Sequence, residues 1–349
     1  MRSHWDFLLA VQILAIGAIS LLIIFSINRN LAQNQFIFWL MGLIVLYFVS
    51  HFDYKSLKNI TVPLYLIVLT SLVLLLLFGE PIRGSVRWVD LGIFRVQPSE
   101  IAKAAIILLL ATFYGNRSAK DLKNVFLSFL IVLPTALLVF LQPDIGNTLA
   151  ILAIWFGISL ISGLRLAPIV LLAIILGTLA FVFFETLAPY QKQRIESFIN
   201  PGQDPLGTGY NIIQSKIAIG AGQILGKGFA QGSQSQLKFL PEAESDFIFA
   251  SIAEQLGFLG AALLLFVYSS LLLRLIHFAK RAERFGQLVL FGIASFFLAQ
   301  FLINVGMNMG LLPVTGITYP LVSYGGSSLI VSLFLLGLVF SVIRFNRRS

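Results

Sequence analysis

Long hydrophobic runs recur along this chain of 349 residues, and short polar segments separate them. A helix needs about 20 mostly apolar residues to cross a hydrocarbon layer about 30 Å thick. Ten runs are close to that length, and they lie near residues 7–27, 31–50, 60–78, 97–114, 124–141, 145–162, 166–187, 246–273, 285–308 and 320–343. The pattern predicts an all-α polytopic membrane protein with about ten transmembrane helices.

Two of the segments between these runs are long enough to form substantial outer loops. One covers residues 79–96, and the other covers residues 188–245, between the seventh and eighth predicted helices. Isoleucines between positions 212 and 219 keep a partial helical spacing, which predicts short amphipathic helices at the outer membrane surface. Since no soluble domain or internal repeat is evident, residues 1–349 are expected to form a single integral membrane domain.

The composition agrees with this prediction. Hydrophobic residues make up 58% of the chain and charged residues 11%, whereas a soluble domain averages about 25% charged residues. The absence of cysteine excludes a disulfide framework and a thiolate metal site. Residues 7–27 are too long and too continuously apolar for a signal-peptide core, so they are expected to be a retained first helix.

The net charge of +9 would fit nucleic-acid binding, but the basic residues gather on one side of the predicted topology. With a cytoplasmic N-terminus, the inner segments hold fourteen of them: Arg2, Lys55, Lys58, Arg117, Lys120, Lys123, Arg165, Arg274, Lys280, Arg281, Arg284, Arg344, Arg347 and Arg348. The short outer loops hold four: Arg29, Arg83, Arg87 and Arg95. This bias follows the positive-inside rule, so both termini are expected in the cytoplasm and nucleic acid is not expected as a partner.

Charged residues also occur inside the predicted helices, where they usually face the bundle interior. Glu100 and Lys103 are three residues apart and can pair on one helix face, either as a structural salt bridge or as a functional pair. Gln142 and Asp144 open the sixth run. Asp144 fits two roles: it can cap the helix start, which favours an acid, or it can line a polar cavity.

Acidic residues gather where the long outer loop meets the eighth run. Glu242, Asp246 and Glu254 recur at intervals of four or eight, so they share one face with Ala250 if the helix begins early. Asp246 could cap that helix together with Ser245, but capping does not explain the whole group. Grouped acids can supply a general base or hold a divalent cation opposite a phosphate, and the predicted cation ligands are Asp246 and Glu242.

Basic and small polar residues add candidate substrate contacts. The outer loops carry possible counter-charges for an anionic lipid head group: Arg83, Arg87, Lys192, Arg194, Lys216 and Lys227. Residues 306–328 are rich in Gly and Pro and fit either close helix packing or an irregular segment lining a cavity. Ser323 and Ser327 in this segment are candidate cavity residues.

Five long motifs show a resemblance to a known family. They read RGSVRWVDLGIFRVQPSEIAK, LQPDIGNTLA, YQKQRIESFINPGQDPLGTGYNIIQSKIAIGAGQILGKGF, FLPEAESDFIFASIAEQLGFLG and GMNMGLLPVTGITYPLVSYGGSSL. Together they resemble the bacterial SEDS family (shape, elongation, division and sporulation), in its RodA branch more than in its FtsW branch. The resemblance implies ten transmembrane helices and a peptidoglycan glycosyltransferase that polymerises lipid II at the outer face of the cytoplasmic membrane, for cell elongation.

The resemblance also assigns roles to residues. The family's essential outer-loop aspartate matches Asp246, its membrane Glu–Lys pair matches Glu100 and Lys103, and its Gln-Pro-Asp motif matches residues 142–144. Where the family usually has His before the aspartate, this chain has Glu244, so the role of that position stays unassigned. The implied partners are a class B penicillin-binding protein, which is a transpeptidase, and other proteins of the elongation machinery.

The expected mechanism uses Asp246 as the base that takes a proton from the 4-hydroxyl of an acceptor lipid II. A single inverting displacement then releases undecaprenyl pyrophosphate, with Mg²⁺ or Mn²⁺ and the loop arginines neutralising its charge. Two other functions remain open: a lipid II flippase, for which Glu100, Lys103 and Asp144 matter more than Asp246, and a non-catalytic scaffold for the transpeptidase.

Overall fold

The computed structural model describes residues 6–79, 86–90, 92, 95–165, 170, 177–178 and 209–346. The long helices in these ranges are α1 (Phe7–Ile27), α2 (Arg29–His51), α3 (Thr61–Phe78), α4 (Pro98–Gly115), α5 (Leu122–Leu141), α6 (Ile145–Ile161), α11 (Ile248–Ala279), α12 (Arg284–Asn308) and α13 (Gly326–Asn346). Shorter elements are η1 (Tyr54–Ile60), α9 (Tyr210–Gly222), α10 (Ser233–Gln236), β1 (Val89–Asp90) and β2 (Arg95–Val96).

Each predicted hydrophobic run other than 166–187 corresponds to one of these long helices. Eight of the described helices are long and apolar enough to cross a membrane, and α6 is a shorter apolar helix of 17 residues. The predicted seventh helix falls almost entirely outside the described residues, as do positions 188–208 of the long outer loop. The all-α membrane fold is therefore confirmed, and the total of ten stays a prediction.

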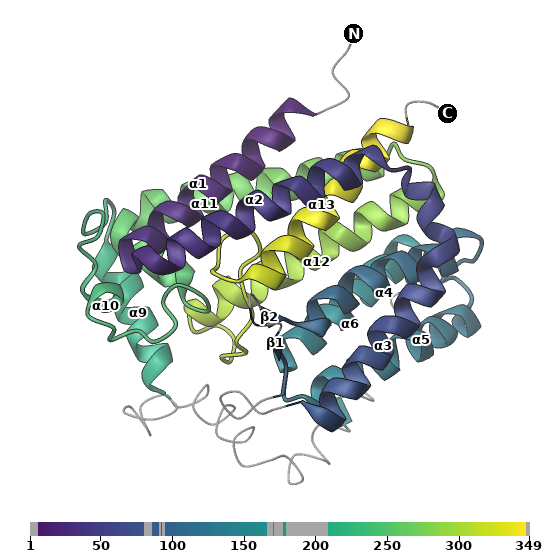
Figure 1. Ribbon diagram of the computed structural model, residues 1–349, viewed down its shortest axis with the longest axis horizontal. Coiled ribbons are helices and arrows are strands. Elements are labelled where there is room, and N and C mark those ends of the chain that lie inside the picture. The colour runs from purple at the N-terminus through teal and green to yellow at the C-terminus, as the bar shows by residue number, and fades with distance from the viewer. Residues whose placement is uncertain are drawn as a thin grey trace.

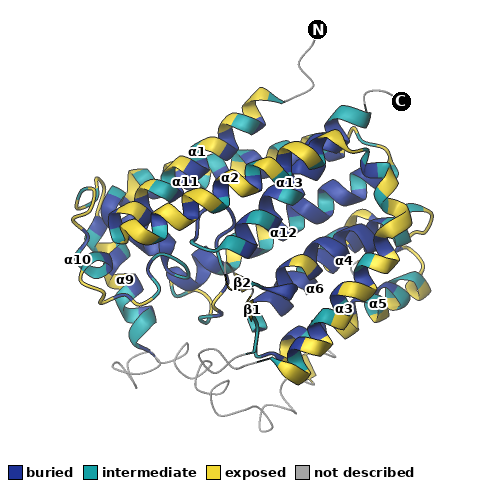
Figure 2. Cartoon of the chain, viewed as in Figure 1, coloured by how far each residue is buried: buried dark blue, intermediate teal, exposed yellow. Residues whose placement is uncertain are grey.

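The helices form two groups that meet along α4, α12 and α13 (Figure 1). One group contains α1, α2 and α11, and the other contains α3, α5 and α6. Helix α12 packs against α4, α6 and α11, while α13 packs against α2. Helices α4 and α13 are the most enclosed of the long apolar helices described. In each, 78% of the most apolar stretch is buried inside the bundle, against 28% in α2. Figure 2 shows the exposed residues along the outer faces of the peripheral helices.

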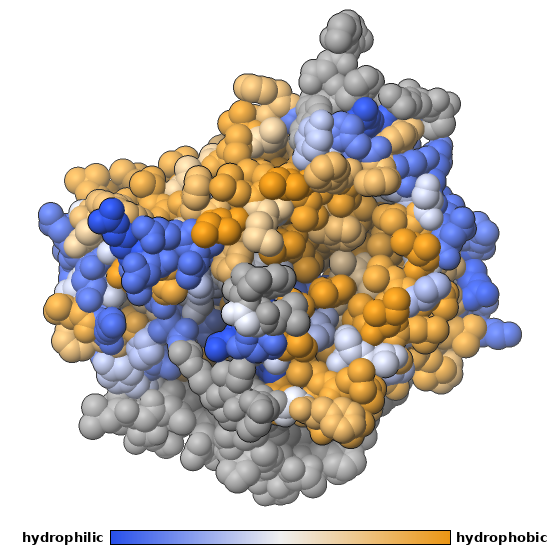
Figure 3. Space-filling model, in the orientation of Figure 1, coloured by the Kyte–Doolittle hydropathy of each residue, from blue (hydrophilic) through white to orange (hydrophobic). Residues whose placement is uncertain are grey.

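The molecular surface is divided into hydrophobic and hydrophilic regions. In Figure 3, hydrophobic residues cover the middle of the visible face, and hydrophilic residues gather toward its left and right ends. Large side chains such as Phe48, Leu77 and Phe266 are more than half exposed on the helices. Exposed apolar side chains in such numbers are unfavourable in water, but they suit a surface covered by lipid chains.

Helix α11 differs from the single helix predicted over 246–273. It begins at Ile248, and Gly257 has φ 68° and ψ −168°, which splits it into residues 248–256 and 258–279. The loop after α9 bonds the backbone groups freed at this break: Gln223 O accepts from Phe258 N at 2.8 Å, and Glu254 O accepts from Lys227 N at 2.9 Å. Only glycine adopts this φ readily, and satisfying the freed groups keeps the kink in an apolar setting.

Candidate active site

The acidic group ahead of α11 lies in a series of turns, residues 241–247. The predicted helical face shared by Glu242, Asp246, Ala250 and Glu254 is therefore wrong, because the helix begins at Ile248. Within the turns, Ser245 Oγ donates to Glu242 Oε2 at 3.0 Å. Asp246 is partly exposed, whereas Glu254 is fully buried. The acids thus occupy two different environments.

Asp246 is held from α12 through its backbone. Its carbonyl oxygen accepts hydrogen bonds from Asn304 Nδ2 at 3.0 Å and from Asn308 Nδ2 at 2.9 Å. Its carboxylate faces Gly316, where a Cβ atom, if present, would lie 3.5 Å from Oδ2. Gly316 has φ +69°, a conformation that residues with a side chain rarely adopt. Glycine at this position therefore permits the backbone conformation and leaves space beside the carboxylate.

The segment between α12 and α13 fixes the rest of the acidic turn. Ser323 Oγ donates to Ser245 O at 2.5 Å, and Tyr324 N donates to Glu244 O at 2.8 Å. Ser323 Oγ also accepts from Tyr319 N at 2.8 Å. The Ser323 hydroxyl is thus engaged within the protein, and its predicted contact with substrate stays a prediction.

The predicted Glu100–Lys103 pair is confirmed and belongs to a larger buried network. Lys103 Nζ donates to Glu100 Oε1 at 2.6 Å and to Asn147 Oδ1 at 2.7 Å. Asp144 Oδ2 accepts from Asn147 Nδ2 at 2.9 Å and from Gln97 Nε2 at 3.0 Å. All five side chains are less than a tenth exposed. The two charged motifs therefore form one polar cluster between α4 and α6, because their helices pack together.

Asp144 also caps α6, as one of the two sequence interpretations predicted. Its Oδ1 accepts from Asn147 N at 3.2 Å. Sequence reasoning did not place Gln97 in the cluster. The signal available for it was its position one helical turn before Glu100, but only the packing of α4 on α6 shows that it reaches Asp144.

The same α12–α13 segment contacts both acidic sites. Ile317 O accepts from Asn304 Nδ2 at 2.8 Å, on the side of Asp246. Gly146 at the start of α6 packs against Thr315 and Ile317. Residues 315–317 therefore contact both the acidic turn and the start of α6, a spatial relation that the separation of about a hundred positions between Asp246 and Asp144 concealed.

The loop before α4 brings Arg87 to the Gln-Pro-Asp motif. Arg87 Nε donates to Gln142 O at 3.2 Å, and its guanidinium also bonds Pro143 O. Gln142 Nε2 donates to Leu72 O at 2.9 Å. Ser327 Oγ donates to Arg95 O at 2.7 Å and so links β2 to α13. Arg87 is thereby anchored by backbone carbonyls beside the polar cluster.

The loop that carries Arg87 forms a short hairpin, in which β1 pairs antiparallel with β2. Asp90 accepts hydrogen bonds from Gly92 N at 2.8 Å and from Arg95 Nε at 3.2 Å. The bond from Gly92, followed by that from Arg95, lowers the pKa of the Asp90 carboxyl below its ordinary value.

Glu254 has a structural role. Its carboxylate accepts from Gln234 N at 2.8 Å, Ser235 N at 3.1 Å and Ser235 Oγ at 2.9 Å. These donors belong to the first residues of α10, so Glu254 caps this short helix from the side of α11. Lys227 Nζ lies 3.9 Å from the same carboxylate. Glu254 therefore fastens the outer loop to α11.

The remaining basic candidates are only partly described. Lys216 is exposed on α9, and its side chain lies against Gly310 just after α12. Helix α9 packs on α11 and buries Ile212, so it is more than a surface helix. Arg83, Lys192 and Arg194 lie outside the described residues.

The predicted cation ligands, Asp246 and Glu242, belong to the same turn. Over the described ranges, no group of three or more His, Cys, Asp or Glu side chains is arranged to hold a metal ion. Mg²⁺ usually takes one or two carboxylates and completes its shell with substrate phosphates and water. Two carboxylates could share an ion with a pyrophosphate but could not enclose one alone, so the cation stays a prediction.

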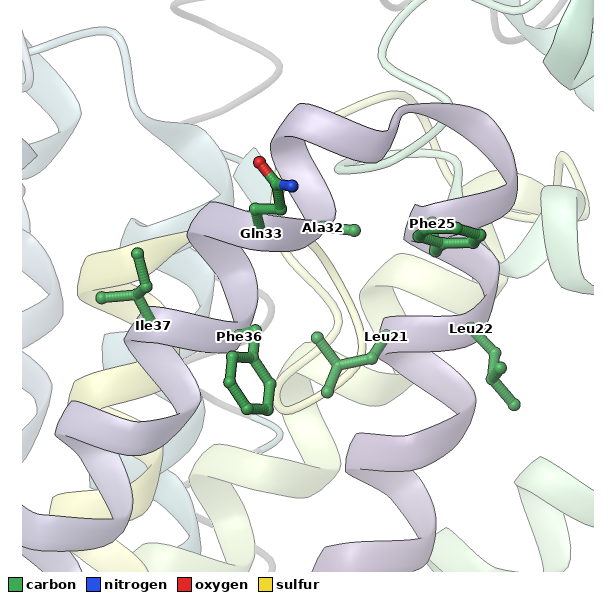
Figure 4. Close-up of a pocket in the computed structure, with 7 residues that line it drawn as sticks. All are labelled: Leu21, Leu22, Phe25, Ala32, Gln33, Phe36 and Ile37. Carbon is green, nitrogen blue, oxygen red and sulfur yellow. The ribbon is translucent and has the colours of Figure 1, made fainter.

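A separate groove of about 580 Å³ lies between α1 and α2 (Figure 4). It is lined by Leu21, Leu22, Phe25, Ala32, Gln33, Phe36 and Ile37. Gln33 is the one polar side chain among these residues, and none of them is ionisable. The groove suits hydrocarbon, and it lacks the chemistry for a reaction.

Comparison with known proteins shows to which family this chain belongs. A family model described as "Cell cycle protein" and named for FtsW, RodA and SpoVE matches residues 3–348. The chain belongs to the SEDS family. Its relatives in this family include the peptidoglycan glycosyltransferase MrdB of Escherichia coli K12, 38% identical over 98% of this chain and 94% of that protein. Stage V sporulation protein E of Bacillus subtilis is 36% identical over 99% of both.

Solved structures of SEDS proteins have the same fold. A chain from a study titled "Structural coordination of polymerization and crosslinking by a peptidoglycan synthase complex" aligns with a TM-score of 0.87 and 31% identity, over 99% of both chains. Thermus thermophilus RodA aligns with a TM-score of 0.76 and 28% identity, over 99% of this chain and 98% of RodA. This SEDS protein is a multi-pass membrane peptidoglycan glycosyltransferase of cell-wall synthesis.

Proposed function

We propose that this glycosyltransferase polymerises lipid II into β-1,4-linked glycan strands at the outer face of the cytoplasmic membrane, for cell elongation, with Asp246 as the general base. The observation that carries the proposal is the setting of Asp246. Asp246 is partly exposed and its carboxylate faces a glycine, while its backbone is held by two buried asparagines. A base needs access to its substrate together with a fixed position.

In this mechanism, Asp246 accepts the proton of the 4-hydroxyl on the acceptor sugar. The oxygen then forms a bond to the anomeric carbon of the donor glycan, and the bond from that carbon to undecaprenyl pyrophosphate breaks. An α-linked donor that gives a β-linked product requires one inversion, so a single displacement with one base is sufficient. A positioned base typically contributes about 10²–10⁴-fold to the rate.

Basic residues of the outer loops would balance the charge of the leaving pyrophosphate. Arg87 is the one among them whose anchoring is described, because carbonyls 142 and 143 hold its guanidinium. Arg83, Lys192, Arg194 and Lys216 are proposed for the same role. A divalent cation, Mg²⁺ or Mn²⁺, shared by Asp246, Glu242 and the phosphates would supply further charge neutralisation, and no step above depends on it.

The orientation proposed here puts both termini in the cytoplasm. Both described ends of the chain lie beside the end of α11: Asp6 pairs with Arg274 at 2.6 Å, and Asn346 Nδ2 donates to Arg281 O at 2.8 Å. Basic residues are concentrated in the chain segments at this end of the bundle, as the positive-inside rule expects for the cytoplasmic side. The acidic turn lies at the opposite end of α11 and so would face the outside.

A class B penicillin-binding protein, a transpeptidase, is the proposed partner, together with other elongation proteins. The support comes from the solved peptidoglycan synthase complex, which coordinates polymerization and crosslinking and one chain of which aligns with 99% of this one. A glycan polymerase delivers the strands that a transpeptidase crosslinks, so the two activities gain from proximity.

The test is polymerisation of labelled lipid II by the purified chain, alone and with its transpeptidase, with glycan products separated on gels. Asp246→Asn removes the base and is expected to abolish polymer while the protein remains folded. Asp121→Asn is the matched control, since Asp121 only caps α5 and Asn caps equally well.

Near-normal polymer from Asp246→Asn would refute the assignment of the base. In vesicles, lipid II that changes leaflets without forming polymer would indicate the flippase instead. No polymer from the folded parent chain with its transpeptidase, together with partner binding that Asp246→Asn leaves unchanged, would indicate the scaffold.

A further inference from the structure

At the start of α11, a side chain from another helix replaces one backbone hydrogen bond of the helix. In a regular α-helix the N–H of Ala250 would donate to the carbonyl of Asp246, four residues earlier. Here Ala250 N donates to Asn308 Oδ1 at 3.0 Å, while Asp246 O accepts from Asn308 Nδ2 at 2.9 Å. The side-chain amide of Asn308 thus takes the place of one helical bond and satisfies both of its groups.

The next bond along the helix is regular. Ser251 N donates to Phe247 O at 3.1 Å, and the helix continues from Ile248. The amide therefore makes α11 begin one residue late and leaves Asp246 in the preceding turn. Without it, the donor and the acceptor would be free to bond one another, and Asp246 would become the N-cap of a helix one residue longer.

The geometry of Asn308 fits this role and little else. Asn308 is fully buried as the last residue of α12. Its second amide hydrogen bonds Asn304 O at 2.8 Å, and its own carbonyl accepts from Ser215 Oγ at 2.7 Å. If the side-chain amide were reversed, its oxygen would face the carbonyl oxygen of Asp246 and its NH₂ group would face the N–H of Ala250. Both contacts are unfavourable, so the partners fix the orientation of the amide.

We infer that Asn308 is a positioning residue for the reaction: its side-chain amide keeps Asp246 from becoming the N-cap of α11 and so aims the carboxylate at the space beside Gly316. Asn304 supports it as the second donor to Asp246 O. This inference rests on the proposed role of Asp246 as base. An aspartate at the N-cap turns its side chain to accept from the N–H groups of the first helical turn, so moving Asp246 to that position would redirect its carboxylate. A displacement of about 1 Å can cost about 10²-fold in rate.

The test uses Asn308→Asp in the purified full-length chain. This variant keeps the size of the side chain and the acceptor for Ala250 N, but it replaces the donor to Asp246 O by an oxygen. We expect kcat for lipid II polymerisation to fall by about 10²-fold, with KM changed by less than about twofold. If the amide of Asn308 served only folding, its loss would not lower kcat of the folded protein while leaving KM nearly unchanged.

The matched control is Ile293→Ala, which opens a cavity at a fully buried position of the same helix. It should lower the melting temperature at least as much as Asn308→Asp while leaving kcat near that of the parent chain. If Asn308→Asp does not fold, Asn304→Ala provides a second variant, with an expected fall in kcat of about tenfold, since one donor to Asp246 O remains.

Two outcomes would overturn the inference: a folded Asn308→Asp protein whose kcat stays within about threefold of the parent, or an Ile293→Ala control that loses kcat equally. The comparison with Asp246→Asn separates this result from the proposed function. An inactive Asp246→Asn with an active Asn308→Asp rejects the positioning role alone, whereas an active Asp246→Asn rejects the base itself.

Discussion

Replacing Glu254 by alanine would test whether the outer loop is fastened to α11 by this carboxylate. Glu254 is fully buried and accepts three hydrogen bonds from Gln234 and Ser235 at the start of α10. The substitution leaves two backbone N–H groups and one hydroxyl without their acceptor. We expect the bundle to stay folded and the segment around α10 to open more often.

The magnitude follows from the number and kind of bonds lost. A hydrogen bond to a charged group contributes about 1.5–3 kcal/mol. The three bonds share one carboxylate and do not add independently, so we take about 3 kcal/mol for the whole cap. Each 1.4 kcal/mol changes an equilibrium tenfold, so the open population of the loop should rise about 10²-fold.

Limited proteolysis measures this opening locally. Lys238 is an exposed tryptic site just after α10, and cleavage tracks the open population when opening and closing are fast. Mass spectrometry of the fragments should show cleavage at Lys238 accelerated about 10²-fold. Glu283→Ala makes the same change of charge at a half-exposed pair with Lys55 and should leave that rate unchanged. An acceleration below about threefold would refute the reasoning.

Two further predictions concern charged groups elsewhere. Lys103→Met leaves the buried Glu100 carboxylate without its cation and should cost about 3–5 kcal/mol of stability, seen as a lower melting temperature in detergent, whereas Lys103→Met with Glu100→Gln should recover most of the loss. The pKa of Asp90 is lowered in the folded hairpin, so the charged form stabilises it above the ordinary pKa of about 3.9. That stability is lost as pH falls through the lower folded value, and exchange of the Gly92 amide hydrogen should then speed up.

Each of these predictions has its own contrary result. A double variant at positions 100 and 103 no more stable than Lys103→Met would show that the pair does not act as a unit. Amide exchange at Gly92 that follows only the intrinsic pH dependence, or that is the same in Asp90→Asn at neutral pH, would show that the carboxylate does not hold the turn.

The helices that the sequence predicted best are those whose boundaries depend on local chemistry. Run 7–27 corresponds to α1 at both ends, and run 145–162 corresponds to α6 within one residue. Lipid offers no hydrogen-bonding partner to the backbone, so a continuous apolar run must form a helix wherever it crosses. The i,i+3 spacing of Glu100 and Lys103 likewise predicted their pairing, because that contact lies within one helix.

The prediction was wrong where distant segments set the local structure. The start of α11 depends on Asn308, which lies 58 positions beyond Ala250, and no pattern around Asp246 signals an amide arriving from another helix. Glu254 was predicted to share a helical face with Asp246, yet its donors lie about twenty positions earlier, on α10.

Sequence alone determined that this chain is a helical membrane protein, which residues would be charged within it, and which family it resembles. Those properties follow from composition and from spacing within single helices. Only the tertiary structure decided that Asp246 stands outside its helix, that Glu254 is a cap, and that Asp144 joins the Glu100–Lys103 pair. Each of these depends on a hydrogen bond between separate elements, and their meeting is set by packing of the whole bundle.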